Sequence, residues 1–180
     1  MDRVDYCRIS ENRYREQKGL FFEDFTRGLV IEHRPGRTIT LTDSVWQSLL
    51  SMNPHPLHLD EEFADRSEYG GLIVPNLVTL CIVDGLTAHS ITQNASACLS
   101  WDAVQPSTPV FIGDTLYAES KVLDVRDYLP RENHGAVIVH TSGRNQHGVT
   151  VIEFTRTVLV KRRTAAVCYE AIQNDKLTQN

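Results

Sequence analysis

The sequence predicts one α+β domain in which an antiparallel sheet wraps around a single long central helix. Three observations support this prediction. The chain has 180 residues, 41% of them hydrophobic, which suits one domain with a sizeable core, and no linker, repeat or low-complexity stretch divides it. One segment in the middle of the chain is apolar on nearly every side, which is typical of a buried helix. The segments after it are rich in Val, Ile and Thr and are joined by short turns, which is typical of antiparallel strands.

The two ends of the chain differ from the middle in composition. Residues 1–18 and 164–180 are polar and mixed in charge. We therefore expect an N-terminal extension that is flexible or covers a partner, and a C-terminal tail in which residues 165–172 could form a short helix. The domain itself is expected at residues 19–163.

Two elements are expected before the central helix. Residues 37–41 form an Arg-Thr-Ile-Thr-Leu run that predicts a short strand. A helix is expected at residues 44–50, with either Thr42 or Asp43 as its N-cap, since a side-chain oxygen there can accept a hydrogen bond from the first turn.

The central helix is expected over residues 72–89, after the Gly-Gly pair that ends the preceding segment. Pro75 is acceptable in its first turn, because the N–H that proline lacks has no partner inside a helix at that position. From Val78 to Leu86 the only charged residue is Asp84. A helix of this composition is expected to be buried on most of its faces.

Four strands are expected after the helix, at residues 97–104, 115–125, 136–145 and 150–160. The last of them alternates clearly, with apolar side chains on one face at Ile152, Phe154, Val158 and Val160. Arg156 alone interrupts that face. A nearly all-apolar helix followed by a meander of strands is the pattern of the hot-dog architecture, in which the sheet rolls around the helix.

The most informative segment lies between the two expected helices, at residues 51–64. Two prolines there, Pro54 and Pro56, fix φ and hold the chain extended, which suits a rigid site loop. In an extended stretch Asn53 and His55 lie on one side and His58 on the other, unless a turn brings them together. Histidine titrates near neutral pH, so His58 is a candidate general base.

This segment resembles the signature of the MaoC-like, (R)-specific enoyl-CoA hydratases, which is Asp-x-Asn-Pro-x-His followed by an acidic residue and Phe-Ala. Pro56 and His58 match the signature, Asn53 stands at its Asp position and His55 at its Asn position.

Two further motifs at family spacing support the resemblance. Residues 69–77 are similar to the family's glycine turn and the start of its central helix, and residues 110–116 are similar to its Gly-Asp strand motif. The resemblance as a whole extends from about residue 21 to residue 160, so it implies the hot-dog fold for most of the chain.

The resemblance also implies a mechanism. In the family an Asp and a His activate a water that adds across the double bond of an enoyl thioester. The amide of Asn53 cannot accept a proton as a carboxylate can, so the chemistry here would depend on His58 as the general base, with Asn53 orienting the water. Asn76 replaces the glycine that starts the helix in many members. The oxyanion contact beside Pro75 would therefore come from a backbone N–H, which suits a helix N-terminus. His55 would be a substrate-binding residue.

One branch of the family is similar in carrying Asn before Gln or His and then Pro-Leu-His. Residues 92–94 and 101–102, Thr-Gln-Asn and Trp-Asp, resemble further motifs of that branch, the mesaconyl-CoA and itaconyl-CoA hydratases. The implied substrate is a short dicarboxylic 2-enoyl-CoA. Its free carboxylate would call for an arginine, and Arg37 and Arg66 are the candidates nearest the motif.

Other functions remain open from the residues. The hot-dog pattern is also similar to that of acyl-CoA thioesterases. Those enzymes usually need an acidic residue on the central helix, and Asp84 is the only acidic residue there. A non-catalytic acyl-CoA-binding relative is the third possibility, because Asn53 has replaced the acid. For Asp84 itself we expect a position at a dimer interface or at the edge of solvent rather than a functional role.

Several charged residues and cysteines have simpler roles open to them. Asp60 is expected to cap the helix that begins near Glu61. Arg156 is expected either to extend its head group to water or to pair with Glu153 or Glu119. Cys81 and Cys98 lie among apolar residues and are expected in the core. The basic run Lys161-Arg162-Arg163 could meet the phosphates of CoA or be a solvated strand end.

Composition disfavours several classes of function. The formal net charge of −5 is unfavourable for nucleic-acid binding. The four cysteines show no C-x-x-C pair, so neither a zinc site nor a disulfide framework is expected. No signal peptide is recognisable, and the longest apolar run is too short to span a bilayer. We expect a soluble cytoplasmic protein without metal or redox cofactor. By resemblance, we expect a homodimer, or an assembly of dimers, whose sheets join edge to edge.

Overall fold

The structure is a computed structural model of the chain, and it describes residues 6–16 and 18–165. The strands are β1 (Tyr6–Ser10), β2 (Arg13–Glu16), β3 (Val30–Thr38), β4 (Ala95–Pro106), β5 (Thr115–Asp127), β6 (His134–Arg144) and β7 (Thr150–Lys161). The α-helices are α1 (Leu41–Leu50), α2 (Glu61–Asp65) and α3 (Asn76–Thr87), with short 3-10 helices η1 (Phe22–Asp24) and η2 (Pro56–His58) and a π-helical turn η3 (Ala88–Thr92).

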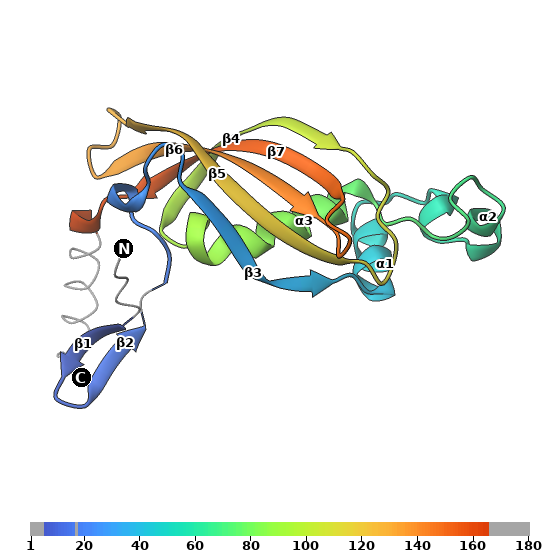
Figure 1. The fold of residues 1–180 in the computed structure, drawn as a ribbon, viewed down its shortest axis with the longest axis horizontal. Helices are drawn as coiled ribbons and strands as arrows, with labels where there is room; N and C mark the ends of the chain where they lie inside the picture. Colours follow the sequence, from blue (N-terminus) through green and yellow to red (C-terminus); the bar gives the residue numbers. More distant parts are fainter. Residues whose placement is uncertain (1–5, 17, 166–180) are drawn as a thin grey trace.

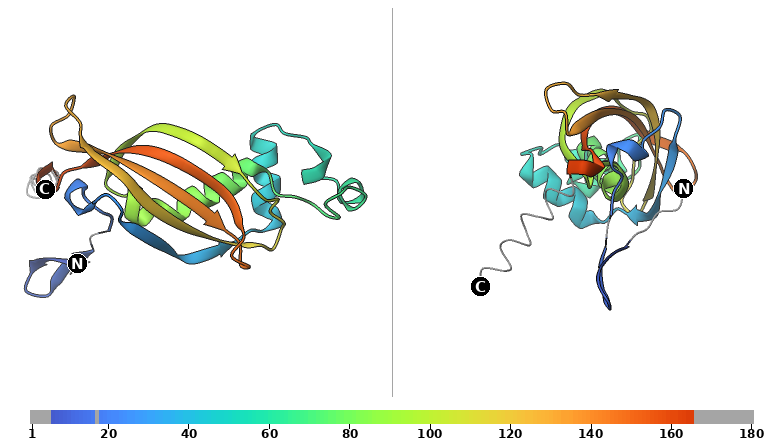
Figure 2. Two further views of the ribbon diagram at one scale, coloured as in Figure 1. Left: turned by 45° about the horizontal axis from the view of Figure 1, so that its top comes forward. Right: turned by 90° about the vertical axis from the view of Figure 1, so that its left-hand side faces the viewer.

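Five strands form one antiparallel sheet in the order β3-β5-β6-β7-β4, and this sheet curves around α3 (Figure 1). The view along the barrel in Figure 2 shows α3 inside the rolled sheet. The prediction of an α+β hot-dog fold is therefore confirmed. The four strands expected after the helix lie within three residues of their expected ends.

The strand expected at residues 37–41 is displaced. Strand β3 begins at Val30 and ends at Thr38, and its pairing with β5 shifts register between His33 and Arg37. Pro35 and Gly36 lie inside this irregularity. A proline is tolerated in an edge strand or at a bulge, where its missing N–H removes no ladder bond.

The helix after β3 begins earlier than expected. Its N-cap is Thr40, so both Thr42 and Asp43 are wrong as N-caps. Thr40 Oγ1 accepts a hydrogen bond from Asp43 N, and Asp43 Oδ2 accepts one from Thr40 N at 2.9 Å, so the two residues form a capping box. Burial would raise the pKa of Asp43, but the hydrogen bonds from Thr40 and the nearby charge of Arg37 outweigh it and lower the pKa.

Helix α3 is shorter than expected and is not buried on most faces. Pro75 is its N-cap, and the last residues expected in it belong to η3. One side of α3 packs into the barrel, while Leu77, Cys81 and Gly85 on the other side are exposed. The expectation that Cys81 and Cys98 lie in the core is wrong, since both are exposed. Apolar composition did not distinguish the face of α3 that meets the sheet from the face that does not.

The interior holds two apolar clusters. The first surrounds the N-terminal half of α3 and includes Val78, Ile82 and Phe154, and the second lies further along the barrel and includes Ile91 and Val139.

Buried polar side chains lie within the same interior. His33 Nε2 is 2.9 Å from Ser120 Oγ, which is 2.9 Å from Thr141 Oγ1, and His33 Nδ1 is 3.0 Å from Ser90 Oγ. Arg156 is also buried there. The barrel therefore contains a hydrogen-bonded set of polar groups from β3, β5, β6 and η3.

The described part of the N-terminal extension lies away from the barrel. Strands β1 and β2 form a separate two-stranded hairpin within the N-terminal extension, at the opposite end of the molecule from α2 (Figures 1 and 2). The short helix expected at residues 165–172 lies almost entirely outside the described residues. Among the described residues, no helix has the length and apolar character needed to cross a membrane.

Candidate active site

His58 lies at the end of η2, in the segment that leaves the barrel after α1. Its Nδ1 is 2.8 Å from the carbonyl oxygen of Ile73, and Ile73 N donates to Leu57 O at 3.1 Å. A carbonyl oxygen can only accept a hydrogen bond, so in the neutral ring the proton is on Nδ1 and Nε2 carries the lone pair. The backbone thus orients His58 with Nε2 as its basic nitrogen.

The residue that holds His58 leads directly into α3. Val74 N donates to Val110 O at 2.8 Å, and Ile73 forms a bridge with Phe111. These contacts fix the chain just before the helix. Ile73 precedes Asn76, the first residue of α3, by three positions, so His58 is anchored beside the start of the central helix.

The first turn of α3 has backbone N–H groups without an acceptor in the helix. Its N-cap is Pro75, which makes no side-chain capping bond, and Val78 N and Thr79 N are the donors that bond to Pro75 O. The N–H groups of Asn76 and Leu77 precede these bonds, so they have no acceptor within the helix. Together with the helix dipole they favour negative charge at this position.

Asn53 and His55 are bound to the local backbone. Asn53 Oδ1 accepts from His55 N at 3.2 Å, and His55 Nδ1 accepts from Leu57 N at 3.3 Å. The centroids of the His55 and His58 rings are 5.7 Å apart. The turn that this creates brings the two histidines together, although an extended chain would place them on opposite sides.

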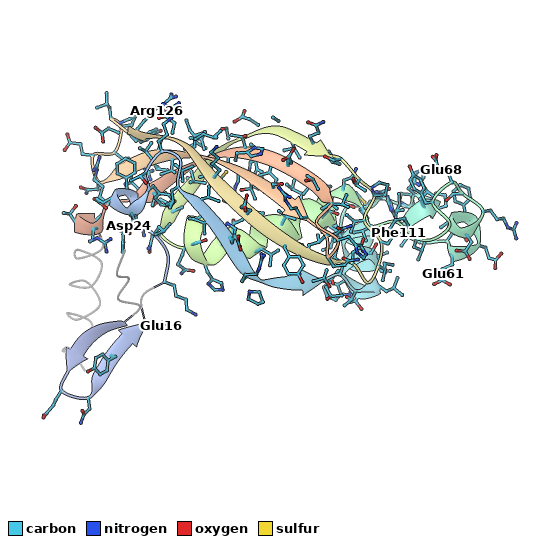
Figure 3. The ribbon with its side chains drawn as sticks, viewed as in Figure 1. Glu16, Asp24, Glu61, Glu68, Phe111 and Arg126 are labelled. Carbon is cyan, nitrogen blue, oxygen red and sulfur yellow. The ribbon has the colours of Figure 1, made fainter. Side chains whose placement is uncertain are left out.

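The segment beyond the histidines projects from the barrel. Glu61 and Glu68 lie on the projection, and Phe111 lies where it joins the barrel (Figure 3). Asp60 caps α2 by accepting from Phe63 N at 3.1 Å, which confirms that expectation. A hollow of about 360 Å³ at the join is lined by Leu41, Glu61, Asp65, Gly71, Leu72, Phe111 and Ile112.

The arginines suggested for substrate binding all have acidic partners in this chain. Arg37 pairs with Asp43 of the capping box. Arg66 pairs with Glu62 at 3.0 Å on the exposed surface.

The basic run at the end of β7 is also paired. Arg162 contacts Asp127, and Arg163 bonds both carboxylate oxygens of Asp24 at 2.6 and 2.8 Å. These two arginines therefore connect the end of β7 to other parts of the fold.

Arg156 differs from both expectations. It is 1% exposed, pairs with Asp84 of α3, donates to Thr87 Oγ1 at 2.9 Å, and lies 5.3 Å from the ring centroid of Trp101. It neither reaches water nor pairs with Glu153 or Glu119. Burial lowers the pKa of Arg156 to about 10, which leaves it charged at neutral pH.

The pairing of Arg156 with Asp84 could have been predicted from the sequence. Asp84 is the only charge in an apolar helix, and Arg156 is the only charge on the apolar face of a strand. Two opposite charges that are each alone among apolar residues of one domain are expected to pair.

Among the described residues, no group of three His, Cys, Asp or Glu side chains is arranged to hold a metal ion. The absence of a metal or redox cofactor therefore stays a prediction from the sequence.

The fold and the site together define a hot-dog protein with a histidine anchored at the N-terminus of its central helix. The chain belongs to the MaoC-like family, because residues 25–144 match the family model described as MaoC like domain.

Relatives with assigned names agree with this membership. The chain is 34% identical to a mesaconyl-CoA hydratase of Cereibacter sphaeroides over 148 residues, which are 82% of this chain and 43% of the relative. It is also 34% identical to a beta-methylmalyl-CoA dehydratase of Chloroflexus aurantiacus over 145 residues, which are 81% of this chain and 41% of that protein. The chain thus spans about two fifths of the length of these relatives.

Solved structures with similar folds also agree with membership of the MaoC-like family. A putative MaoC domain protein dehydratase from Chloroflexus aurantiacus aligns with a TM-score of 0.75 at 34% identity, over 81% of this chain and 41% of that one. A monoamine oxidase regulatory protein from Archaeoglobus aligns with a TM-score of 0.70 at 28% identity, over 81% of this chain and 97% of that one.

Proposed function

We propose that the chain is the catalytic unit of a hydro-lyase that reversibly adds water to the double bond of a short 2-enoyl-CoA. The observation that carries the proposal is the anchoring of His58 by Ile73 O, which holds the ring to the chain three residues before α3 and leaves Nε2 as its basic nitrogen. The names of the relatives, mesaconyl-CoA hydratase and beta-methylmalyl-CoA dehydratase, support this class of reaction.

The chemistry follows from the two groups at this position. His58 Nε2 takes a proton from water while the water oxygen forms a bond to the β-carbon of the enoyl group. The electron pair of the double bond moves toward the thioester, whose oxygen becomes an enolate. The N–H groups of Asn76 and Leu77 stabilise that developing charge. Transfer of the proton from His58 to the α-carbon completes the addition of one water and restores the neutral imidazole.

A dicarboxylic substrate such as mesaconyl-CoA is the specific form of the proposal, with itaconyl-CoA as a second compound to test. Its free carboxylate needs a cation near the site. Arg37 remains our candidate, since an exposed ion pair such as the one with Asp43 is worth only about 0–1 kcal/mol and can be exchanged.

The test is steady-state hydration of a panel of 2-enoyl-CoA esters that includes mesaconyl-CoA, with water addition followed by mass spectrometry. We expect His58→Ala to lower kcat/KM by about 10²–10⁴-fold, the usual contribution of a general base. His147→Ala is the matched control, because this exposed histidine lies in the turn between β6 and β7. Equal rates for wild type and His58→Ala would contradict the mechanism.

A thioesterase is the alternative that the same assay separates, because hydrolysis releases free CoA thiol. The acid that this activity would need is Asp84. Its carboxylate is paired with the buried guanidinium of Arg156, so it is not free to act as a base. This observation favours the hydratase.

We also propose that two copies of the chain form a homodimer through the edge of the sheet at β4. Three large apolar side chains of β4 are exposed by 42–43%: Leu99, Trp101 and Val104. Among the described residues, the other edge strand of this sheet, β3, exposes only Val30 to that extent. A long apolar edge strand invites pairing with another strand, and a twofold contact between β4 edges would also cover the exposed side of α3.

Sedimentation measurements test the dimer. Leu99→Asp places a charge at the centre of the proposed contact and is expected to shift the protein toward monomer. Val30→Asp makes the same change on the opposite edge and should leave the assembly intact. A monomeric wild type, or equal effects of the two variants, would contradict the proposed contact.

A further inference from the structure

The two histidines near the start of α3 are held with opposite polarity. A backbone carbonyl accepts from Nδ1 of His58, whereas a backbone N–H donates to Nδ1 of His55. In the neutral ring of His55 the lone pair is therefore on Nδ1 and the proton on Nε2. At their other nitrogens, His58 offers an acceptor and His55 offers a donor.

We propose that His55 is a second catalytic residue, whose Nε2–H holds the reacting water while His58 Nε2 deprotonates it. The inference rests on the proposed hydratase function and adds a residue to it. In this arrangement His55 orients the water, and His58 is the base.

The geometry suits one water between the rings. A water with two hydrogen bonds of about 2.9 Å at a tetrahedral angle separates its two nitrogen partners by roughly 4.7 Å. The ring centroids of His55 and His58 are 5.7 Å apart with the planes tilted by 53°. Each Nε2 is about one ångström from its centroid, so the two Nε2 atoms lie between about 3.5 and 8 Å apart, a range that includes the separation one bridging water needs.

Asn53 supports His55 in this role. Its Oδ1 already accepts the backbone N–H of His55, and its backbone N–H is bound to Ser48 O at 2.9 Å. The residue thus fixes the turn that presents His55.

The step balances without a change in the charge of His55. The water donates one O–H to His58 Nε2 and accepts a hydrogen bond from His55 Nε2–H. As the oxygen bonds to the β-carbon, that O–H breaks and its proton passes to His58. His55 keeps its proton throughout and stabilises the negative charge that develops on the oxygen, as a neutral imidazole donor can.

Two substitutions separate this role from a structural one. His55→Asn keeps a side-chain oxygen near the position of Nδ1, so it can still cap η2 by accepting from Leu57 N, but it lacks a donor at the position of Nε2. His55→Gln places an amide N–H close to the position of Nε2 and loses the cap. We expect His55→Asn to unfold near the wild-type temperature with kcat lowered about 10²-fold. We expect His55→Gln to be less stable but at least tenfold more active than His55→Asn.

A carboxylate at position 53 provides a rescue. In the double variant Asn53→Asp with His55→Asn, one carboxylate oxygen can accept the backbone N–H at position 55 and the other can accept from the water. We expect kcat to rise at least tenfold over His55→Asn alone, with KM unchanged.

The outcomes distinguish this inference from the proposed function. Wild-type activity in His55→Asn, or activity of His55→Gln no higher than that of His55→Asn, would overturn the role of His55 while leaving the hydratase in place. A wild type that hydrates no ester of the panel would instead contradict the proposed function itself.

Discussion

His33 is a neutral histidine inside the barrel, and its burial makes the stability of the fold depend on pH. It is 4% exposed, and its two ring nitrogens lie beside the hydroxyls of Ser120 and Ser90. Desolvation, with smaller effects of the charges of Arg156 and Arg34, lowers its pKa from 6.5 to about 4. At 1.36 kcal/mol for each unit, protonation of His33 costs the folded state about 3 kcal/mol.

The direction follows from proton binding. Below pH 6.5 the unfolded chain binds a proton at His33, but the folded chain binds it only near pH 4. Stability is therefore lost as the pH falls through this window, at a rate that approaches about 1.4 kcal/mol for each pH unit. His33→Gln cannot titrate and retains hydrogen-bonding groups. Between pH 6.5 and 5, we expect the free energy of unfolding of wild type to fall by about 2 kcal/mol more than that of the variant.

Urea unfolding at several pH values measures both proteins under the same conditions. The pKa of His134 is also lowered by burial, but His134 is present in both proteins and its effect cancels in the difference. Parallel pH profiles for wild type and His33→Gln would refute the reasoning.

Two further predictions concern packing and charge in the same fold. Asp84→Ala leaves Arg156 buried without a counter-charge and should lower the free energy of unfolding by about 3 kcal/mol. Asp127→Ala removes an exposed ion pair and should change the free energy of unfolding by less than about 1 kcal/mol. Equal losses for the two variants in urea unfolding would refute this prediction. Gly135→Ala would place a Cβ 2.2 Å from the ring of Phe22 and should lower the thermal unfolding temperature, at a cost of about 1–3 kcal/mol. Phe22→Ala in the same chain should reduce that loss, and a Gly135→Ala protein as stable as wild type would contradict the contact.

The sequence predicted the sheet well because its last strands are regular. In β7 the side chains alternate between the core and the opposite face, so periodicity alone locates it. Strand β3 was less predictable, since Pro35 and Gly36 break its pattern at a bulge. The hairpin β1–β2 was not predicted at all, because its polar residues carry no periodic apolar signal.

The candidate site was predicted in its residues but not in its geometry. The motif identified His58, yet only the structure shows that Ile73 O selects its basic nitrogen. The position of His55 depends on a turn closed by the hydrogen bond from His55 N to Asn53 Oδ1. The two prolines had predicted an extended segment without this turn. Neighbours distant in the chain, such as Ile73, cannot be read from local spacing.

The ion pair between α3 and β7 also bears on how the helix is positioned. An apolar helix in an apolar barrel could turn about its axis or slide with little loss of buried area. Turning α3 by one residue, about 100°, would carry Asp84 away from Arg156 and leave a charge without a partner in a medium of low polarity. The pair therefore penalises every other orientation of the helix. Because α3 begins beside His58, a contact two turns away helps to set where the N–H groups of Asn76 and Leu77 point.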